Sequence, residues 1–140
     1  YNDEWMRERG FLEEDILTAK DLVNKHEDKP LVSVFAEELV SHAISKMRKF
    51  GISQIPVMKD NQFVGSIDDS VIYQTLVDKP ELRDAPISSI MGPAFPIVKS
   101  GTQVDELCKL INKNTPAVLV ESASGSMHIV TRYDIISAMS

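Results

Sequence analysis

The segment Thr131-Arg132-Tyr133-Asp134 combines a hydroxyl and a carboxylate at a spacing that can bind a sugar. It follows an apolar run that predicts a strand, and it precedes a helical pattern. The hydroxyl can bond a ribose or phosphate oxygen, and the carboxylate can accept hydrogen bonds from both hydroxyls of a ribose diol. A helix start also offers unpaired backbone N–H groups. The segment could therefore hold a ribose-containing ligand, with Arg132 available to a phosphate.

The same four residues also fit a capping box. In that arrangement Thr131 and Asp134 satisfy each other's backbone N–H groups at the start of the helix. Taken alone, the four residues favour the cap over the ligand contact, and both uses remain open.

A flat ring carried by such a sugar would need an apolar slot with polar edges, and two segments supply suitable side chains. Ile129 and Val130 stand directly before the motif. The other segment contains Ile52, Gln54, Ile55, Pro56 and Val57. Gln54 can hydrogen-bond a ring edge or a ligand carboxylate, whereas Val57 is better explained as a core residue. Pro56 lacks an N–H, which predicts a sheet edge or a cleft rim.

The elements that must position these residues recur twice along the chain. The first copy has a short turn at 18–23, an extended run at 31–35 and a helix ended by Gly51. A hairpin at 55–67 and a helix at 71–76 follow. The apolar face of the first helix is formed by Leu39, Val40, Ala43, Ile44, Met47 and Phe50.

The second copy has the same order: a turn at 87–91, an extended run at 95–98, a helix, a hairpin at 117–130 and a closing helix. Ser100 or Thr102 can cap its first helix. The apolar faces of its two helices are formed by Val104, Leu107, Cys108 and Ile111, and by Ile135, Ile136 and Met139. Gly51 aligns with Asn114, 63 residues later. We therefore predict an α+β fold of two tandem β-α-β-β-α repeats, packed as a pseudo-twofold pair.

Composition excludes several classes of function. The 140 residues carry a net charge of −6 and no basic stripe, which argues against nucleic acid and anionic membrane as partners. One cysteine excludes an internal disulfide framework, and the histidines lack metal-ligand spacing. No apolar run approaches the ~20 residues that cross a bilayer. No catalytic residues and no metal site are predicted, and a reduced cytoplasmic setting is expected.

Three sequence motifs resemble those of a known protein family. Gly51-Ile52-Ser53-Gln54-Ile55-Pro56-Val57, Val64-Gly65-Ser66-Ile67 and Ile129-Val130-Thr131-Arg132-Tyr133-Asp134 resemble those of a tandem CBS-domain pair, or Bateman module. The likeness covers about residues 18–140. We expect the first repeat at 18–80 and the second at 81–140.

The opening stretch Tyr1-Asn2-Asp3-Glu4-Trp5-Met6 is similar to the end of the catalytic domain of bacterial cystathionine β-synthases, which are pyridoxal-phosphate (PLP) enzymes. This resemblance implies a C-terminal regulatory region cut from such an enzyme, with residues 1–17 as the linker from the catalytic domain. PLP would then belong to the missing domain, and no cofactor is expected in this fragment.

The family resemblance implies that Thr131 and Asp134 hold an adenosyl ribose, and it places Ser33 and Val34 near the adenosyl cleft. In the first copy, Asp68-Asp69-Ser70-Val71 stands in place of the threonine–aspartate motif. We therefore expect one competent site, which combines first-copy residues with the second-copy motif.

S-adenosylmethionine, AMP and ATP share the adenosine half and differ in the tail. The acidic balance favours the sulfonium ligand, as does the likeness to cystathionine β-synthase, whereas Arg132 favours a phosphate. The expected function is a non-catalytic module that senses an adenosyl ligand and controls the attached enzyme as a homodimer. An AMP- or ATP-sensing pair and a structural oligomerisation module with decayed sites are the alternatives.

Overall fold

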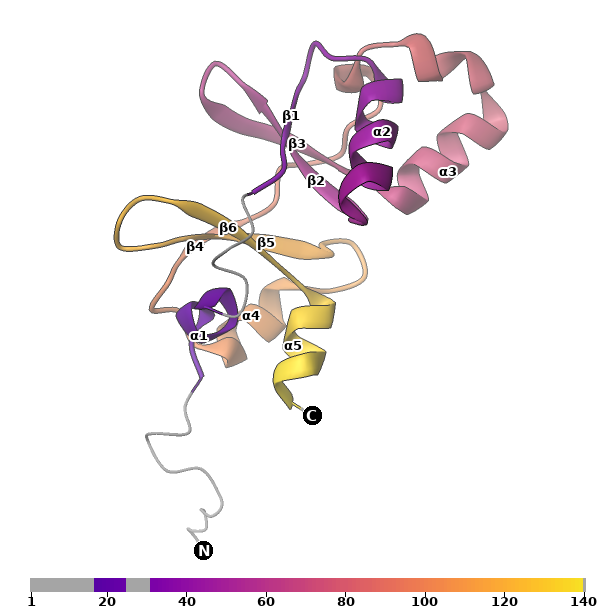
Figure 1. Ribbon diagram of the computed structural model, residues 1–140. Coiled ribbons are helices and arrows are strands. Elements are labelled where there is room, and N and C mark those ends of the chain that lie inside the picture. The colour runs from indigo at the N-terminus through magenta and orange to yellow at the C-terminus, as the bar shows by residue number, and fades with distance from the viewer. Residues whose placement is uncertain (1–16, 25–30, 140) are drawn as a thin grey trace, which may run out of the picture. The chain divides into compact units, whose positions relative to one another are not determined.

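The computed structural model describes residues 17–24 and 31–139 of the chain, which form two compact units (Figure 1). We call residues 31–95 the N-terminal unit. Residues 17–24 together with 96–139 are the C-terminal unit. The predicted linker at 1–17 lies outside the described residues except for Leu17. None of the helices within the described ranges is long and apolar enough to cross a membrane.

The N-terminal unit is a three-stranded sheet with helices, in the predicted order β-α-β-β-α. Its strands are ordered β1-β2-β3, with β1 parallel and β3 antiparallel to β2. The elements are β1 (Val34–Phe35), α2 (Val40–Phe50), β2 (Gln54–Lys59), β3 (Gln62–Asp68), α3 (Asp69–Asp78), η2 (Pro80–Asp84) and η3 (Ile87–Ser89).

The C-terminal unit repeats this sheet as β4-β5-β6, again with one parallel and one antiparallel pair. Its elements are α1 (Ala19–Asn24), β4 (Ile97–Lys99), α4 (Val104–Leu110), β5 (Ala117–Glu121), β6 (Met127–Thr131) and α5 (Arg132–Met139). β2 begins at Gln54 and β5 at Ala117, which confirms the 63-residue offset. The α+β prediction with two repeated units is confirmed.

Two turn predictions are confirmed by the backbone. Gly51 ends α2 in the left-handed conformation, with φ of 63°, which glycine adopts without steric cost. Asp60 and Asn61 join β2 to β3 with φ of 52° and 63°. Two successive positive φ values are typical of the two-residue type I′ turn, which Asn and Asp tolerate well.

Some helix details differ from the sequence prediction. The N-cap of α4 is Gln103, and neither Ser100 nor Thr102 caps it. Cys108 is exposed rather than packed on the apolar face, because the buried stripe passes through Val104, Leu107 and the C-cap residue Ile111 and leaves Cys108 outside it. Phe50 and Ile136 were also expected on buried faces, yet both side chains are exposed.

The two opening turns each pack into the unit built by the other copy. Ala19 in α1 donates its N–H to the Thr102 carbonyl at 2.7 Å, and Leu22 is buried with Leu107 in the core of the C-terminal unit. Ile87 in η3 donates to the Glu38 carbonyl at 2.7 Å and joins the core of the N-terminal unit. The repeats in sequence and the compact units in space therefore have different boundaries.

Gly65 of β3 lies where the segment with Met91 and Gly92 passes alongside this strand. Ser66 pairs with Gly92 through two backbone hydrogen bonds of 3.1 and 2.8 Å. A Cβ atom on Gly65 would lie 2.5 Å from the Met91 sulfur and 2.9 Å from the Gly92 carbonyl oxygen. The Met91 side chain can move, but the Gly92 backbone is held by its hydrogen bonds, so this crossing requires glycine.

We therefore expect Gly65→Ala to lower the free energy of unfolding by about 1–3 kcal/mol, the usual cost of overpacking. Gly101→Ala is the matched control, because a Cβ there meets nothing within 4 Å. Urea denaturation of both variants measures the difference. Equal midpoints for the two variants would refute the close crossing.

Candidate functional site

The predicted sugar-binding motif lies at the junction of β6 and α5. Thr131 is the last residue of β6 and pairs with Ala117, and α5 begins at Arg132. One carboxylate oxygen of Asp134 accepts the Thr131 backbone N–H at 2.8 Å and the Thr131 hydroxyl at 3.2 Å. Thr131 and Asp134 are half-buried, and Arg132 is exposed. The junction thus holds a hydroxyl and a carboxylate side by side.

This geometry fits both roles that the sequence left open, a capping box and a ribose contact. The bond from the Thr131 N–H to Asp134 is one half of a capping box. The negative carboxylate is also favoured in the first turn of a helix by the helix dipole. The same carboxylate could accept hydrogen bonds from the two hydroxyls of a ribose, and its bonds from Thr131 already hold the carboxylate in place.

The equivalent junction of the N-terminal unit has a different arrangement. Asp68 ends β3 and caps α3, accepting the Val71 N–H at 2.9 Å and the Ser70 hydroxyl at 2.7 Å. Val71 occupies the position that Asp134 holds in the second copy. This junction therefore has no carboxylate three residues into the motif, as the sequence indicated.

The two aliphatic residues before the motif face opposite ways along β6. Val130 is fully buried in the core of the C-terminal unit, so it offers no accessible surface to a ligand. Ile129 is half-buried, and the alternation of a strand places it on the same face as Thr131. Ile129 therefore fits the expected apolar contact better than Val130.

The predicted first-copy residues lie at one end of the strands in the N-terminal sheet. The parallel strands β1 and β2 begin at this end and β3 finishes there, so Ser33 and Gln54 lie at the same end as Asp68. The Asp69 N–H donates to the Ser53 carbonyl at 3.0 Å. The fold thus collects Ser33, Val34, Ile52 and Gln54 around the Asp68 junction, within a unit that does not contain Thr131.

Within that group the side chains differ in accessibility. Val34 is buried in the core, whereas Ser33, Ile52 and Gln54 are half-buried. The Ser33 carbonyl accepts the Lys46 ammonium at 2.8 Å. Among these residues, Ser33, Ile52 and Gln54 are therefore the partly accessible ones.

The missing N–H of Pro56 predicted an outer strand of a sheet, and this prediction is wrong. Pro56 is buried on β2, the central strand, opposite Ser66. The Ser66 N–H donates to Gly92 on the other side, so this pair exchanges no hydrogen bond across the ladder. β1 pairs with Val57 and Met58, so a proline at position 56 is accommodated inside the sheet.

The structure adds residues that the sequence reasoning missed. In the C-terminal sheet, Thr131 lies at the end of the strands where β4 and β5 begin. The residues just before these strands, Pro96 before β4 and Thr115 and Pro116 before β5, lie at the same end. The Pro96 carbonyl accepts the Leu119 N–H at 2.8 Å, which fixes the start of β4. The 63-residue offset from Ser33 and Ile52 leads to these positions and could have identified them.

The described part of the chain contains no group of three His, Cys, Asp or Glu side chains that could hold a metal ion.

Comparison with known proteins agrees with this arrangement. The model of the CBS domain family matches residues 19–78 and 87–140. The structure of a CBS-domain protein from Agrobacterium tumefaciens is similar, with a TM-score of 0.79, 16% identity, and coverage of 93% of this chain and 98% of that one. A CBS-domain protein from Burkholderia ambifaria MC40-6 gives a TM-score of 0.78 at 15% identity, covering 88% of this chain and 93% of that one.

A third similar structure is that of CBSX2 in complex with AMP. Its TM-score is 0.59 and its identity 20%, with 78% of this chain and 87% of that chain covered. The family model thus matches twice along the chain, and each matched stretch contains one three-stranded sheet. The chain therefore belongs to the CBS domain family and is a tandem CBS pair, or Bateman module.

Proposed function

We propose that this CBS pair is a non-catalytic regulatory module that binds an adenosyl ligand at the junction of β6 and α5. The carrying observation is the Thr131–Asp134 pair, in which a hydroxyl and a carboxylate lie 3.2 Å apart at the start of a helix. The carboxylate can accept hydrogen bonds from ribose hydroxyls. At the equivalent junction Asp68 is occupied as the cap of α3, and Val71 stands where the second copy has Asp134, which supports a single site in the second copy.

S-adenosylmethionine is our first choice of ligand. Its sulfonium is favoured by the net charge of −6, and its methionyl tail needs no phosphate-binding cluster. Arg132 is the one cation in the motif, and it is exposed. AMP or ATP is the second candidate, favoured by the AMP complex of the similar protein CBSX2 and by Arg132.

We further propose that the module controls a PLP-dependent enzyme of the cystathionine β-synthase type, attached through residues 1–17. The opening stretch Tyr1–Met6 supports this parentage by its resemblance alone. A ligand that favours one conformation of the module by ~1–3 kcal/mol would suffice to regulate such an enzyme. A reduced cytosolic setting, supported by the single cysteine, remains part of the proposal.

Isothermal titration calorimetry of the chain with S-adenosylmethionine, AMP and ATP separates the candidates. We expect saturable binding of S-adenosylmethionine. Binding of AMP or ATP without a response to S-adenosylmethionine would reject our first choice and establish the second. If no adenosyl compound binds at millimolar concentration, the module is structural and its site has decayed.

We also propose that the module forms a homodimer through its exposed helices. Tyr73 and Val77 on α3 are 67% and 60% exposed and line an apolar groove with Ile44 and Met47 of α2. Contiguous apolar surface of this kind is typical of interfaces. No nucleic acid or membrane partner is proposed.

Sedimentation equilibrium should therefore give the mass of a dimer. We expect Tyr73→Glu to give a monomer, because it places a charge in the apolar groove, and Gln74→Glu to leave the dimer intact. A monomeric wild-type chain, or a dimer that tolerates Tyr73→Glu, would contradict this interface.

A further inference from the structure

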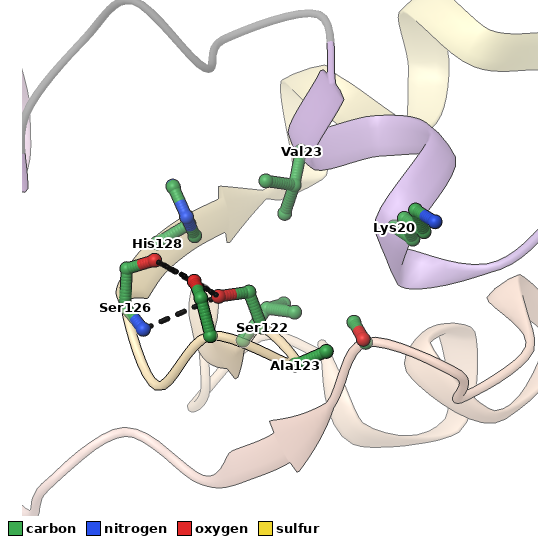
Figure 2. A pocket seen from close by; sticks show the side chains of 9 residues that line it. Lys20, Val23, Ser122, Ala123, Ser126 and His128 are labelled. Atoms are coloured by element: carbon green, nitrogen blue, oxygen red, sulfur yellow. Dashed lines mark hydrogen bonds between the residues drawn. The ribbon is translucent and has the colours of Figure 1, made fainter.

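A cavity of about 310 Å³ lies within the C-terminal unit, between α1 and the turn that joins β5 to β6 (Figure 2). Val23 and Val120 form apolar parts of its wall. Its polar lining consists of Lys20, Ser100, Ser122, Ser124, Ser126 and His128. Figure 2 shows Lys20 and Val23 on the helix facing the turn that carries Ser122 and Ser126.

This cavity is separate from the proposed adenosyl site. It lies at the turn end of β6, whereas Thr131 lies at the other end, where α5 begins. His128 pairs with Val120 and Thr131 with Ala117, three residues apart along the strand. Since successive side chains alternate between the faces of a sheet, His128 and Thr131 face opposite sides.

Three hydroxyl groups converge at the turn. The oxygens of Ser122, Ser124 and Ser126 lie 2.9 Å from one another in all three pairs. The backbone fixes this cluster, because the Ser122 N–H donates to the Ser126 carbonyl and the Gly125 N–H to the Ser122 carbonyl, each at 2.9 Å. Gly125 permits the turn with φ of 91°.

The charges around the cavity leave its lysine available to a ligand. Among the described residues Lys20 makes no ion pair. The neighbouring carboxylate of Asp21 accepts the Thr18 N–H at 2.8 Å and so caps α1. Glu121, at the end of β5, is paired with Lys99 at 2.8 Å. Asp21 and Glu121, which adjoin lining residues in the described part of the chain, therefore already have partners of their own.

We propose that this cavity binds the phosphate group of a small phosphomonoester, a function beyond the sensing of an adenosyl ligand. A lysine ammonium and several hydroxyls are typical donors to a phosphate. On binding, the serine hydroxyls exchange neutral hydrogen bonds with one another for charge-assisted bonds to the anion, which are stronger. A bound phosphate would join α1 to the β5–β6 turn, and α1 directly follows the segment proposed to lead to the enzyme.

Inorganic phosphate is the probe, and NMR of the ¹⁵N-labelled chain is the measurement. We expect saturable shifts in the amide signals of Lys20 and of residues 122–126. Lys20→Gln should weaken binding about tenfold, since it removes the charge-assisted bond while keeping a good helix residue. Ser124→Ala, which removes one exposed hydroxyl, should weaken it severalfold.

Lys109→Gln is the matched control, because Lys109 is an exposed lysine on α4 that pairs with Glu106 at 3.3 Å. Its phosphate affinity should equal that of the wild type. The proposal is overturned if sodium chloride at equal ionic strength causes the same shifts, or if Lys109→Gln weakens binding as much as Lys20→Gln. It is also overturned if the saturable shifts occur at residues 131–134 instead.

Discussion

Asp134→Asn should weaken binding of the adenosyl ligand at least about tenfold while α5 keeps its start. The asparagine retains a side-chain oxygen that can accept the Thr131 N–H, a bond that measures 2.8 Å in the wild type. It loses the negative carboxylate that would accept hydrogen bonds from the ribose hydroxyls. A hydrogen bond to a charged group contributes about 1.5–3 kcal/mol. Each 1.4 kcal/mol corresponds to about tenfold in affinity. Calorimetry of the variant with the ligand that binds the wild type measures the loss.

Asp68→Asn provides the control for this variant. Asp68 ends the equivalent strand and caps α3, and asparagine caps a helix about as well as aspartate. Ligand affinity should be unchanged in Asp68→Asn. An Asp134→Asn variant that binds as tightly as the wild type would show that the site is elsewhere. Equal losses in both variants would argue against a single site in the second copy.

Leu22→Ala should lower the free energy of unfolding of the C-terminal unit by about 2–5 kcal/mol, the cost of a cavity at a buried leucine. Leu22 is 1% exposed and belongs to the core that contains Leu107, Val118 and Val130. The result tests the packing of α1 into the unit built by the second copy. Urea denaturation gives the magnitude, and amide hydrogen exchange shows which strands lose protection.

The matched variant is Leu17→Ala, because Leu17 lies before the same helix with a side chain that is 37% exposed. Its expected cost is under about 1 kcal/mol. In Leu22→Ala we expect β5 and β6 to lose protection from exchange before β2 and β3. Loss confined to β2 and β3, or equal costs for the two leucines, would be incompatible with the observed packing.

The 63-residue offset predicted the strands well because register in a half-buried sheet is strongly specified. Val34 and Ile97, and later Asp69 and Arg132, begin equivalent elements at this spacing. The offset fails in the first helix of each copy, where α2 has 11 residues and α4 has 7. Cys108 lies at the border of the stripe formed by Val104, Leu107 and Ile111, and residue spacing alone does not show where the buried stripe ends.

The packing of the opening turns could not be predicted from local pattern. Ala19 and Leu22 show that a short helix has an apolar face, but the pattern does not indicate which sheet buries it. Proximity in sequence favoured the first copy, and the core of the second copy accepted the helix instead. Tertiary packing decides such choices.

The candidate site was predicted in part, for a related reason. The spacing of Thr131 and Asp134 sufficed to place their side chains together, because the strand-to-helix junction is local. Two adjacent aliphatic residues such as Ile129 and Val130 carry no signal that tells which one faces the core. The sheet-edge position predicted for Pro56 was wrong, because a proline can stand inside a sheet where its partner residue bonds to the other side, as Ser66 does to Gly92.

The most direct test of the adenosyl proposal is an NMR titration of the labelled chain with S-adenosylmethionine. We predict saturable shifts concentrated at residues 131–134 and at 115–117, where the adjoining strand β5 begins. Asp134→Asn should abolish these shifts at the same ligand concentration. Shifts centred on residues 68–71 would contradict the account, and so would a spectrum that S-adenosylmethionine, AMP and ATP all leave unchanged.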